Sequence, residues 1–333
     1  MRAIALTVLV ACAGSATPAT PHATAPASAT STSMTAATAS AFVAPLDASA
    51  DTAEREPTTD YSDGPFRRAA FSVDGTRIAL AGHDLVVIDV ATRRRLHAAD
   101  IGGVTDIRFA PDGKLAALGR SGLSIFVEGH RDAVASVPRS KIAYQGGGVF
   151  WAADSARLFA DGTVRDASLA SQASISYERR EPGFKPESWL VGDGVFSGDT
   201  IRGWRTENGH ATLGSWPAAG GAMRPLGLTV ATARLNVEIV DAQDELLLSH
   251  VDEIAFALTR GSRLVRIVHG DWVAFAGKDR VAVLINGDVE ISPIDKDAPV
   301  TIKGPCDAFA ISRDAKTIAL WSWRNKLELR PLP

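Results

Sequence analysis

The chain has 333 residues, of which 22% are charged, and a formal net charge of −3 at pH 7. This length allows two domains or one large repeat domain. Nucleic-acid binders concentrate Lys and Arg against phosphates, and the near balance of 35 basic and 38 acidic residues argues against that class. No apolar run after the N-terminus reaches the roughly 18 residues that a membrane-spanning helix requires.

The first residues have the layout of an export signal. Arg2 precedes an apolar run over residues 3–11, which ends in small residues before Cys12. A short apolar run behind a basic residue is typical of a secretory signal rather than of a membrane span. One interpretation is an ordinary signal that is cleaved near Ala16 or Ala19.

The ending Leu9-Val10-Ala11-Cys12 resembles a bacterial lipobox. The resemblance implies that residues 1–11 are removed and that the Cys12 thiol carries a lipid. In lipoproteins an aspartate after this cysteine favours the inner membrane; Ala13 stands there instead, which implies the outer membrane. Cys306 is the second of only two cysteines, so we expect no structural disulfide.

The segment after Cys12 has the composition of a spacer. Between residues 13 and 50, 31 of 38 residues are Ala, Thr, Ser or Pro, and only Asp47 is charged. So little bulky apolar surface does not offset the entropy of ordering the chain. We therefore predict a disordered tether over residues 12–64 and a folded body over residues 65–333.

A motif of about forty residues recurs through the body. Each copy has a large apolar residue three positions before a turn and an apolar stretch after it, as in Phe71-Ser-Val-Asp74-Gly75. The predicted turn positions are Asp74-Gly75, Asp112-Gly113, Asp154 and Asp314, with weaker copies at Asp193-Gly194, Ala231 and Lys278. This spacing predicts seven units, although six or eight also fit.

The flanking runs are short and rich in strand formers. Asp-Gly between apolar runs is a strong hairpin signal, because Gly accepts a positive φ and the Asp side chain bonds to nearby backbone. No stretch keeps a 3.6-residue apolar period of helical length. Residues 317–323 are apolar on both faces, as in strands covered by sheets above and below. Four such strands per unit, repeated radially, predict an all-β propeller with four-stranded blades, and a β-helix solenoid is the alternative.

One stretch carries a family resemblance. Phe109-Ala-Pro-Asp112-Gly113-Lys114-Leu115-Ala116 is similar to the F-S-P-D-G-K-x-L-A core of WD-repeat and TolB-like propellers, and Gly129-His130 resembles the start of a WD repeat. The resemblance extends over about residues 66–333 and implies the propeller fold. No Trp-Asp dipeptide occurs, so the chain resembles the degenerate bacterial propellers more than the classical WD repeats.

The last unit leaves room for only three strands before the chain ends. In related propellers a segment from the other terminus completes the last blade. The resemblance therefore implies a fourth strand from residues 41–46, the one apolar stretch of the tether, or from residues near Phe66.

The sequence offers few groups for chemistry. No Gly-x-Ser-x-Gly, His-Glu-x-x-His, P-loop or Cys-x-x-Cys motif is present, and the seven histidines lack metal-ligand spacing. The repeat places four acids at the starts of innermost strands, around one mouth of a central channel: Asp106, Glu187, Asp271 and Asp307. Converging carboxylates suit a hard cation, and related propeller hydrolases and lyases hold a metal there. Local bonding to the backbone is the favoured interpretation, so we predict no metal and no cofactor.

Two aromatic residues and one basic triplet are candidate contact points. Trp204 and Trp216 fall in the Gly-rich residues 194–221, where we expect loops, which commonly carry binding function. The triplet Arg93-Arg94-Arg95 follows a predicted strand and is interpreted as a solvated turn, with contact to anionic lipid as the alternative.

These features together favour a binding protein over an enzyme. We expect a monomeric, lipid-anchored propeller of the cell envelope, attached to the outer membrane and facing the periplasm or the cell surface, with no nucleic-acid partner. Without the anchor we expect a periplasmic or secreted protein. It would bind another envelope protein or a peptide across its loop face. A metal-dependent hydrolase or lyase at the channel mouth is the alternative, because one scaffold hosts many functions.

Overall fold

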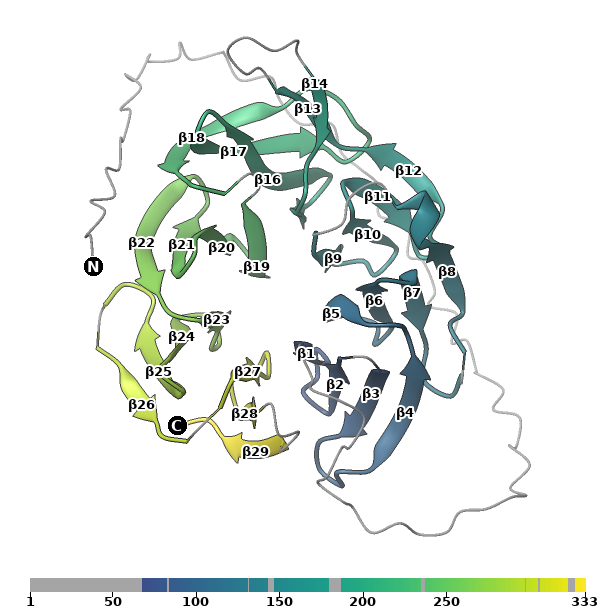
Figure 1. Cartoon of the computed structure of the whole chain (residues 1–333), viewed down its shortest axis with the longest axis vertical. Helices are drawn as coiled ribbons and strands as arrows, with labels where there is room; N and C mark the ends of the chain where they lie inside the picture. The colour runs from purple at the N-terminus through teal and green to yellow at the C-terminus, as the bar shows by residue number, and fades with distance from the viewer. Residues whose placement is uncertain are drawn as a thin grey trace, which may run out of the picture. The chain divides into compact units, whose positions relative to one another are not determined.

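The computed structural model describes residues 68–82, 84–130, 132–142, 147–179, 187–234, 237–296, 298–304, 306–322 and 327–333, with the backbone alone at 178–179 and 187–190. Seven antiparallel sheets surround a common centre (Figure 1). The predicted all-β propeller with seven blades is confirmed. Within these ranges the one helical element is a 3-10 turn at Arg139–Lys141, and no helix is long and apolar enough to cross a membrane.

Each blade is a meander whose first strand lies at the centre of the ring (Figure 1). Blade 1 contains β1 (Arg68–Phe71), β2 (Arg77–Ala81), β3 (Asp84–Asp89) and β4 (Arg95–Asp100). Blade 2 contains β5 (Val104–Phe109), β6 (Leu115–Gly119), β7 (Gly122–Phe126) and β8 (Ala135–Pro138). Blade 3 contains β9 (Val149–Trp151), β10 (Arg157–Ala160), β11 (Thr163–Asp166) and β12 (Ser171–Ser174).

An extra hairpin of β13 (Ser176–Arg179) and β14 (Glu187–Leu190) separates blades 3 and 4. Blade 4 contains β15 (Gly194–Ser197), β16 (Thr200–Glu207), β17 (His210–Pro217) and β18 (Arg224–Ala231). Blade 5 contains β19 (Glu238–Gln243), β20 (Leu246–Asp252), β21 (Ala255–Arg260) and β22 (Arg263–His269). Blade 6 contains β23 (Trp272–Phe275), β24 (Arg280–Ile285), β25 (Asp288–Pro293) and β26 (Val300–Ile302). Blade 7 contains β27 (Ala308–Ile311), β28 (Thr317–Trp321) and β29 (Leu327–Pro331).

The sharp copies of the repeat share one turn geometry. Asp74, Asp112, Asp154 and Asp314 each lie between the first and second strands of a blade. In all four the carboxylate Oδ1 accepts the N–H of the residue two positions on, at 2.9 to 3.2 Å. The intervening residue has a positive φ, which Gly75 and Gly113 adopt without steric cost. The aspartate therefore fixes the turn, which explains why it recurs in the sequence.

The weak copies at Asp193-Gly194 and Ala231 are not turns between first and second strands, and the prediction was wrong there. Asp193 precedes β15, and Ala231 ends β18. In blades 4 and 5 the two strands are joined by only two residues, 198–199 and 244–245, whose first residue has the positive φ. In the sharp copies the aspartate stands three positions before the second strand; a two-residue turn puts that position inside the first strand, at Ser197 and Gln243, so the repeat pattern is lost.

The large apolar residue before each turn packs between blades. Phe71 joins the cluster between blades 7 and 1, and Phe109 joins the cluster between blades 1 and 2. In blade 5 the position opposite Leu247 is the small Ala242. Phe150 of blade 3 packs into this cluster between blades 4 and 5, where Ala242 leaves space. A side chain from a third blade thus completes the core at that interface.

Blade 7 has three strands among the residues that are described, whereas the other six blades have four. The ring closes at the centre, where β1 contacts both β27 and β5. At the rim, Val300 lies opposite Ile291, which belongs to the core between blades 6 and 7. Residues paired across a ladder share a face, so Val300, 58% exposed, faces the side where blade 7 lacks a strand. Both predicted closing segments, residues 41–46 and residues near Phe66, lie outside the described ranges.

A pair of truncations distinguishes these two segments. Only three residues join β4 to β5 and two join β22 to β23, so a closing strand that ends shortly before β1 matches the other blades. We expect deletion of residues 13–50 to leave the melting temperature within about 1 °C, and deletion of residues 13–64 to lower it by at least about 5 °C. Differential scanning calorimetry measures both, and a fall after the shorter deletion would instead assign the strand to residues 41–46.

Candidate functional site

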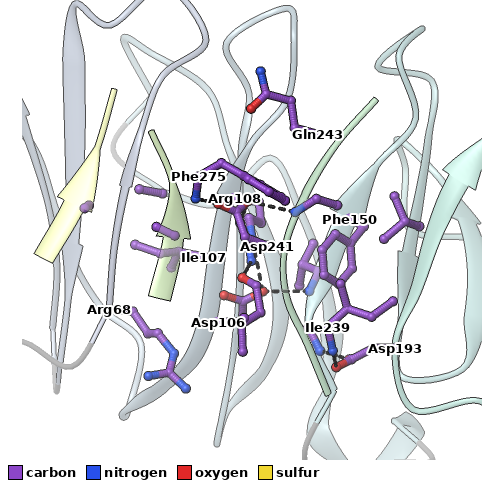
Figure 2. Close-up of a pocket in the computed structure, with 18 of the residues that line it drawn as sticks. Arg68, Asp106, Ile107, Arg108, Phe150, Asp193, Ile239, Asp241, Gln243 and Phe275 are labelled. Carbon is purple, nitrogen blue, oxygen red and sulfur yellow. Dashed lines mark hydrogen bonds and ion pairs between the residues drawn. The ribbon is translucent and has the colours of Figure 1, made fainter. Parts of the chain in front are cut away.

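The central channel is a cavity of about 1140 Å³ lined by the first strand of every blade. Because each of these strands pairs with only one neighbour, its second edge faces the cavity. The charged residues that line it include Asp106 and Arg108 of β5, Glu238 and Asp241 of β19, and Asp193 before β15 (Figure 2). The lining also contains Arg68, Arg234, Asp244, Asp271 and Arg313. The hydrogen bonds and ion pairs of these side chains show whether they are available to a ligand or are used to hold the blades together.

Arg108 spans the channel from blade 2 to blade 5. Its Nη2 donates to the carbonyl oxygen of Val240 at 2.6 Å, and its Nη1 lies 3.6 Å from Asp241 Oδ1. Its Nε donates to Asp106 Oδ2 at 3.5 Å, and its guanidinium lies 5.1 Å from the ring centroid of Phe150 (Figure 2). Burial alone would lower the pKa of Arg108, but the Asp106 and Asp241 charges raise it above its ordinary value.

Three aspartates bind backbone N–H groups on other blades. The N–H of Val149 donates to Asp106 Oδ2 at 2.8 Å, and the N–H of Phe275 donates to Asp241 Oδ2 at 2.9 Å. Asp193 accepts from Ile239 at 2.8 Å and also from the N–H of Gly148. Each carboxylate therefore ties the inner edge of one blade to another, and Asp193 joins blades 3, 4 and 5.

Asp193 is the most deeply buried of these acids, with 3% of its surface exposed. Burial raises its pKa to about 7, although the Gly148 and Ile239 N–H groups act to lower it. The negative charges of Glu238 and Asp106 add to the rise. A buried carboxyl whose pKa lies near neutrality changes charge within the physiological range.

One mouth of the channel carries a second charged group. Glu238 Oε2 lies 3.5 Å from Arg234 Nη2 and 3.9 Å from His250 Nδ1. His250 stacks on the ring of Phe256 with centroids 4.5 Å apart. His250 and Arg234 hold the pKa of Glu238 below its ordinary value. Glu238, Arg234 and His250 thus contact one another at the edge of the channel.

The four predicted acids do not form a metal centre in the described part of the chain. Asp106 is bonded to Val149 and Arg108, while Asp271 and Asp307 are exposed and their own N–H groups donate to the backbone of the second strand. Glu187 starts β14 in the extra hairpin, and its side chain lies outside the described residues. Among the side chains that are described, no group of three or more His, Cys, Asp or Glu residues is placed to hold a metal ion.

Trp204 and Trp216 are not exposed loop residues, and that prediction was wrong. They lie in β16 and β17, with 4% and 0% of their surfaces exposed. Trp204 Nε1 donates to Ser249 Oγ at 2.9 Å, which links blade 4 to blade 5. Three of the glycines that suggested loops, Gly194, Gly203 and Gly214, are close-packed positions within strands, while the other four lie in the connections between strands.

Gly203 shows why a glycine is required inside β16. A Cβ there would lie 2.7 Å from the carbonyl oxygen of Asp193 and 2.9 Å from Val191 Cγ1. We expect Gly203→Ala to destabilise the fold by about 1–3 kcal/mol, because the backbone has to move to admit the methyl group. Urea denaturation measures the change, and an unchanged midpoint would show that this contact is not tight.

Sequence reasoning missed Arg108 and Asp241, and it assigned Asp193 a different role. The one signal for Arg108 is a charged residue two positions after Asp106 in a strand that is otherwise suited to the core. Its partner Asp241 is 133 residues further along the chain. No local pattern indicates a contact over that separation.

The comparisons with known proteins support the fold only. No family model matches the chain, and no curated protein matches it. A solved structure titled "Structure of U3-55K" is similar with a TM-score of 0.59 and 13% sequence identity, covering 81% of this chain and 96% of that one. At this identity the likeness shows the propeller and carries no function. In all, 961 chains of solved structures match, so the architecture is too widespread to identify a ligand.

Proposed function

We propose that the protein is a non-enzymatic binding scaffold, anchored to the cell envelope by a lipid on Cys12, that holds another envelope protein or a peptide. The observation that supports a binding role is the use of the central charges. Asp106, Asp193 and Asp241 are bonded to neighbouring blades, and Arg108 is bonded across the channel to blade 5. They are therefore occupied with holding the ring together, and the remaining recognition surface is the channel wall and the loops.

The N-terminal layout supports the anchor. The lipobox-like ending before Cys12 and the Ala, Ser, Thr and Pro-rich tether would place the propeller at some distance from a membrane surface. The residue after Cys12 is Ala13 and not an aspartate, which favours the outer membrane as the site of attachment. A rigid ring on a spacer suits a protein that reaches a partner in the periplasm.

The test is purification of the mature protein from its native envelope, followed by mass spectrometry of Cys12 and of co-purified proteins. We expect a lipidated Cys12 at the N-terminus and one partner at near-equal amount. The Cys12→Ser variant is the matched control, and we expect it to leave the membrane fraction while it still binds the purified partner. An unmodified Cys12 in a full-length chain would contradict the anchor, and absence of any saturable partner would contradict the scaffold.

A further inference from the structure

We propose that the outer edge of blades 1 and 2 binds an anionic lipid bilayer through three arginines and two exposed apolar side chains. This inference rests on the proposed lipid anchor and adds to it the surface of the propeller that faces the membrane. The arginines are Arg93, Arg94 and Arg95, where the chain passes from β3 to β4, and the apolar side chains are Leu96 and Val134. β4 and β8 are the outermost strands of these two blades (Figure 1).

The turn between β3 and β4 presents its arginines on a bonded backbone. The N–H of Arg93 donates to the carbonyl oxygen of Asp89 at 2.8 Å, and the N–H of Asp89 donates to that of Arg94 at 2.9 Å. The Asp89 carboxylate also accepts the N–H and the hydroxyl of Thr92, both at 2.7 Å. All of residues 91–96 are exposed. Because the backbone of the turn is already fixed, binding a surface orders only the side chains and costs little further entropy.

Leu96 and Val134 hold equivalent places in adjacent blades. They are 45% and 48% exposed, and they are two of the four large apolar residues that are exposed in the described part of the chain. Leu96 precedes the residue that pairs with the fourth residue of β3, and Val134 precedes the residue that pairs with the fourth residue of β7. The next residue after Leu96, His97, contacts Phe126 of blade 2, with 5.3 Å between the ring centroids. Equivalent places in neighbouring blades lie on the same side of the ring, so both apolar side chains reach one surface together with the arginines.

The charges at this edge are complementary to an anionic surface. The nearby acids are Asp89, which is bonded within the turn, the exposed Asp132, and Glu128, which is paired with Arg77 at 2.7 Å. The three arginines therefore leave a positive excess there, in a chain whose formal net charge is −3. Cations beside exposed apolar side chains are the combination that binds the headgroup region of an anionic membrane.

The anchor makes so small a patch sufficient. A lipid on Cys12 holds the propeller close to the membrane, so the second contact forms at a high effective concentration and needs little affinity of its own. A contact at the outer edge leaves the central channel open to a partner. The patch thus orients the propeller, and the anchor holds it.

The experiment measures sedimentation of the mature full chain with lipid vesicles at low salt. The chain carries Cys12→Ser, so that no lipid anchor contributes, and the vesicles contain equal parts of phosphatidylglycerol and phosphatidylcholine. We expect binding to these vesicles and none to pure phosphatidylcholine. Each arginine near an anionic surface contributes a factor of about five, so the double variant Arg93→Gln, Arg94→Gln should bind about 30-fold more weakly. Leu96→Ser should bind about fivefold more weakly.

Blade 5 provides the matched control. Arg260 and Arg263 are exposed and flank the equivalent turn, between β21 and β22. The double variant Arg260→Gln, Arg263→Gln makes the same change of charge on another blade, and we expect its binding to stay within about twofold of the parent chain. Ile254→Ser is the control for Leu96→Ser, because Ile254 is 56% exposed in the turn between β20 and β21.

Other results would overturn the proposal. Equal binding to pure phosphatidylcholine, an equal loss in the blade 5 control, or unchanged binding by the folded Arg93→Gln, Arg94→Gln variant would each do so. If that variant kept its vesicle binding and lost a co-purified protein, the turn would bind an acidic protein instead of lipid. The anchor and this contact fail separately. An unmodified Cys12 in the native protein rejects the anchor, whereas a lipidated Cys12 with no vesicle binding by the Cys12→Ser chain rejects this contact alone.

Discussion

Arg108→Met is expected to lower the free energy of unfolding by about 3 kcal/mol. The substitution removes the charge-assisted bond to Val240 and two ion pairs, and it leaves Asp106 and Asp241 facing the channel without their cation. Breaking a fully buried pair costs about 3–5 kcal/mol, and the low end applies because 27% of the Arg108 side chain is exposed. In a domain of this size we expect the melting temperature to fall by roughly 6–12 °C.

Arg94→Met is the matched control for this variant. Arg94 lies in the exposed turn between β3 and β4, and no contact of its side chain is present among the described residues. We expect a change of no more than about 0.5 kcal/mol there. Equal effects of the two substitutions, measured by urea denaturation, would show that Arg108 does not hold blades 2 and 5 together.

The second large effect is a pH dependence that belongs to Asp193. In the unfolded chain its pKa is near 3.8, and in the folded protein burial raises it to about 7. The folded state therefore binds a proton more tightly, so this group stabilises the fold at low pH. That contribution is lost as the pH rises from about 4 to about 7. The rise corresponds to roughly 4 kcal/mol over this window.

Asp193→Asn removes this titration and so isolates it. At pH 4.5 we expect the variant to be the less stable protein. The Asp193 carboxyl accepts hydrogen bonds from two backbone N–H groups, and in the variant the amide nitrogen replaces one of the accepting oxygens and cannot accept. Between pH 4.5 and pH 8 we expect the wild type to lose roughly 3 kcal/mol relative to the variant, since only the wild type ionises there. Urea denaturation of both proteins across that range measures the difference. If the free energies of unfolding of the two proteins changed with pH in the same way, the pKa of Asp193 would not be raised in the folded protein.

The fold was predictable because its signals are local. The bonds from Thr76 to Asp74 and from Lys316 to Asp314 span two residues, so the same short motif marks the same turn in distant blades. Where a two-residue turn replaces that motif, as at 198–199, the local signal disappears and the unit was placed wrongly. The predicted number of blades was nevertheless correct, because the chain length between the sharp copies corresponds to a whole number of blades.

The site was less predictable because its contacts are not local. Asp106 was singled out as an acid at a strand start, but its role follows from the N–H of Val149, 43 residues away. The tryptophans were misplaced because glycine-rich composition indicates loops, whereas Gly203 and Gly214 instead permit close packing beside Trp216 and Met223. The sequence alone does not distinguish a glycine in a loop from a glycine at a close-packed strand position, because the difference depends on contacts with residues of other strands.

The central claim is that the charges in the channel are cross-ring ties, with Arg108 of blade 2 bonded to Asp241 of blade 5. A double-mutant cycle with Arg108→Met and Asp241→Asn tests it most directly, because the cycle isolates the energy that the two side chains share. We predict a coupling of at least about 1 kcal/mol in the free energy of unfolding. Effects that add to within about 0.3 kcal/mol would contradict the account.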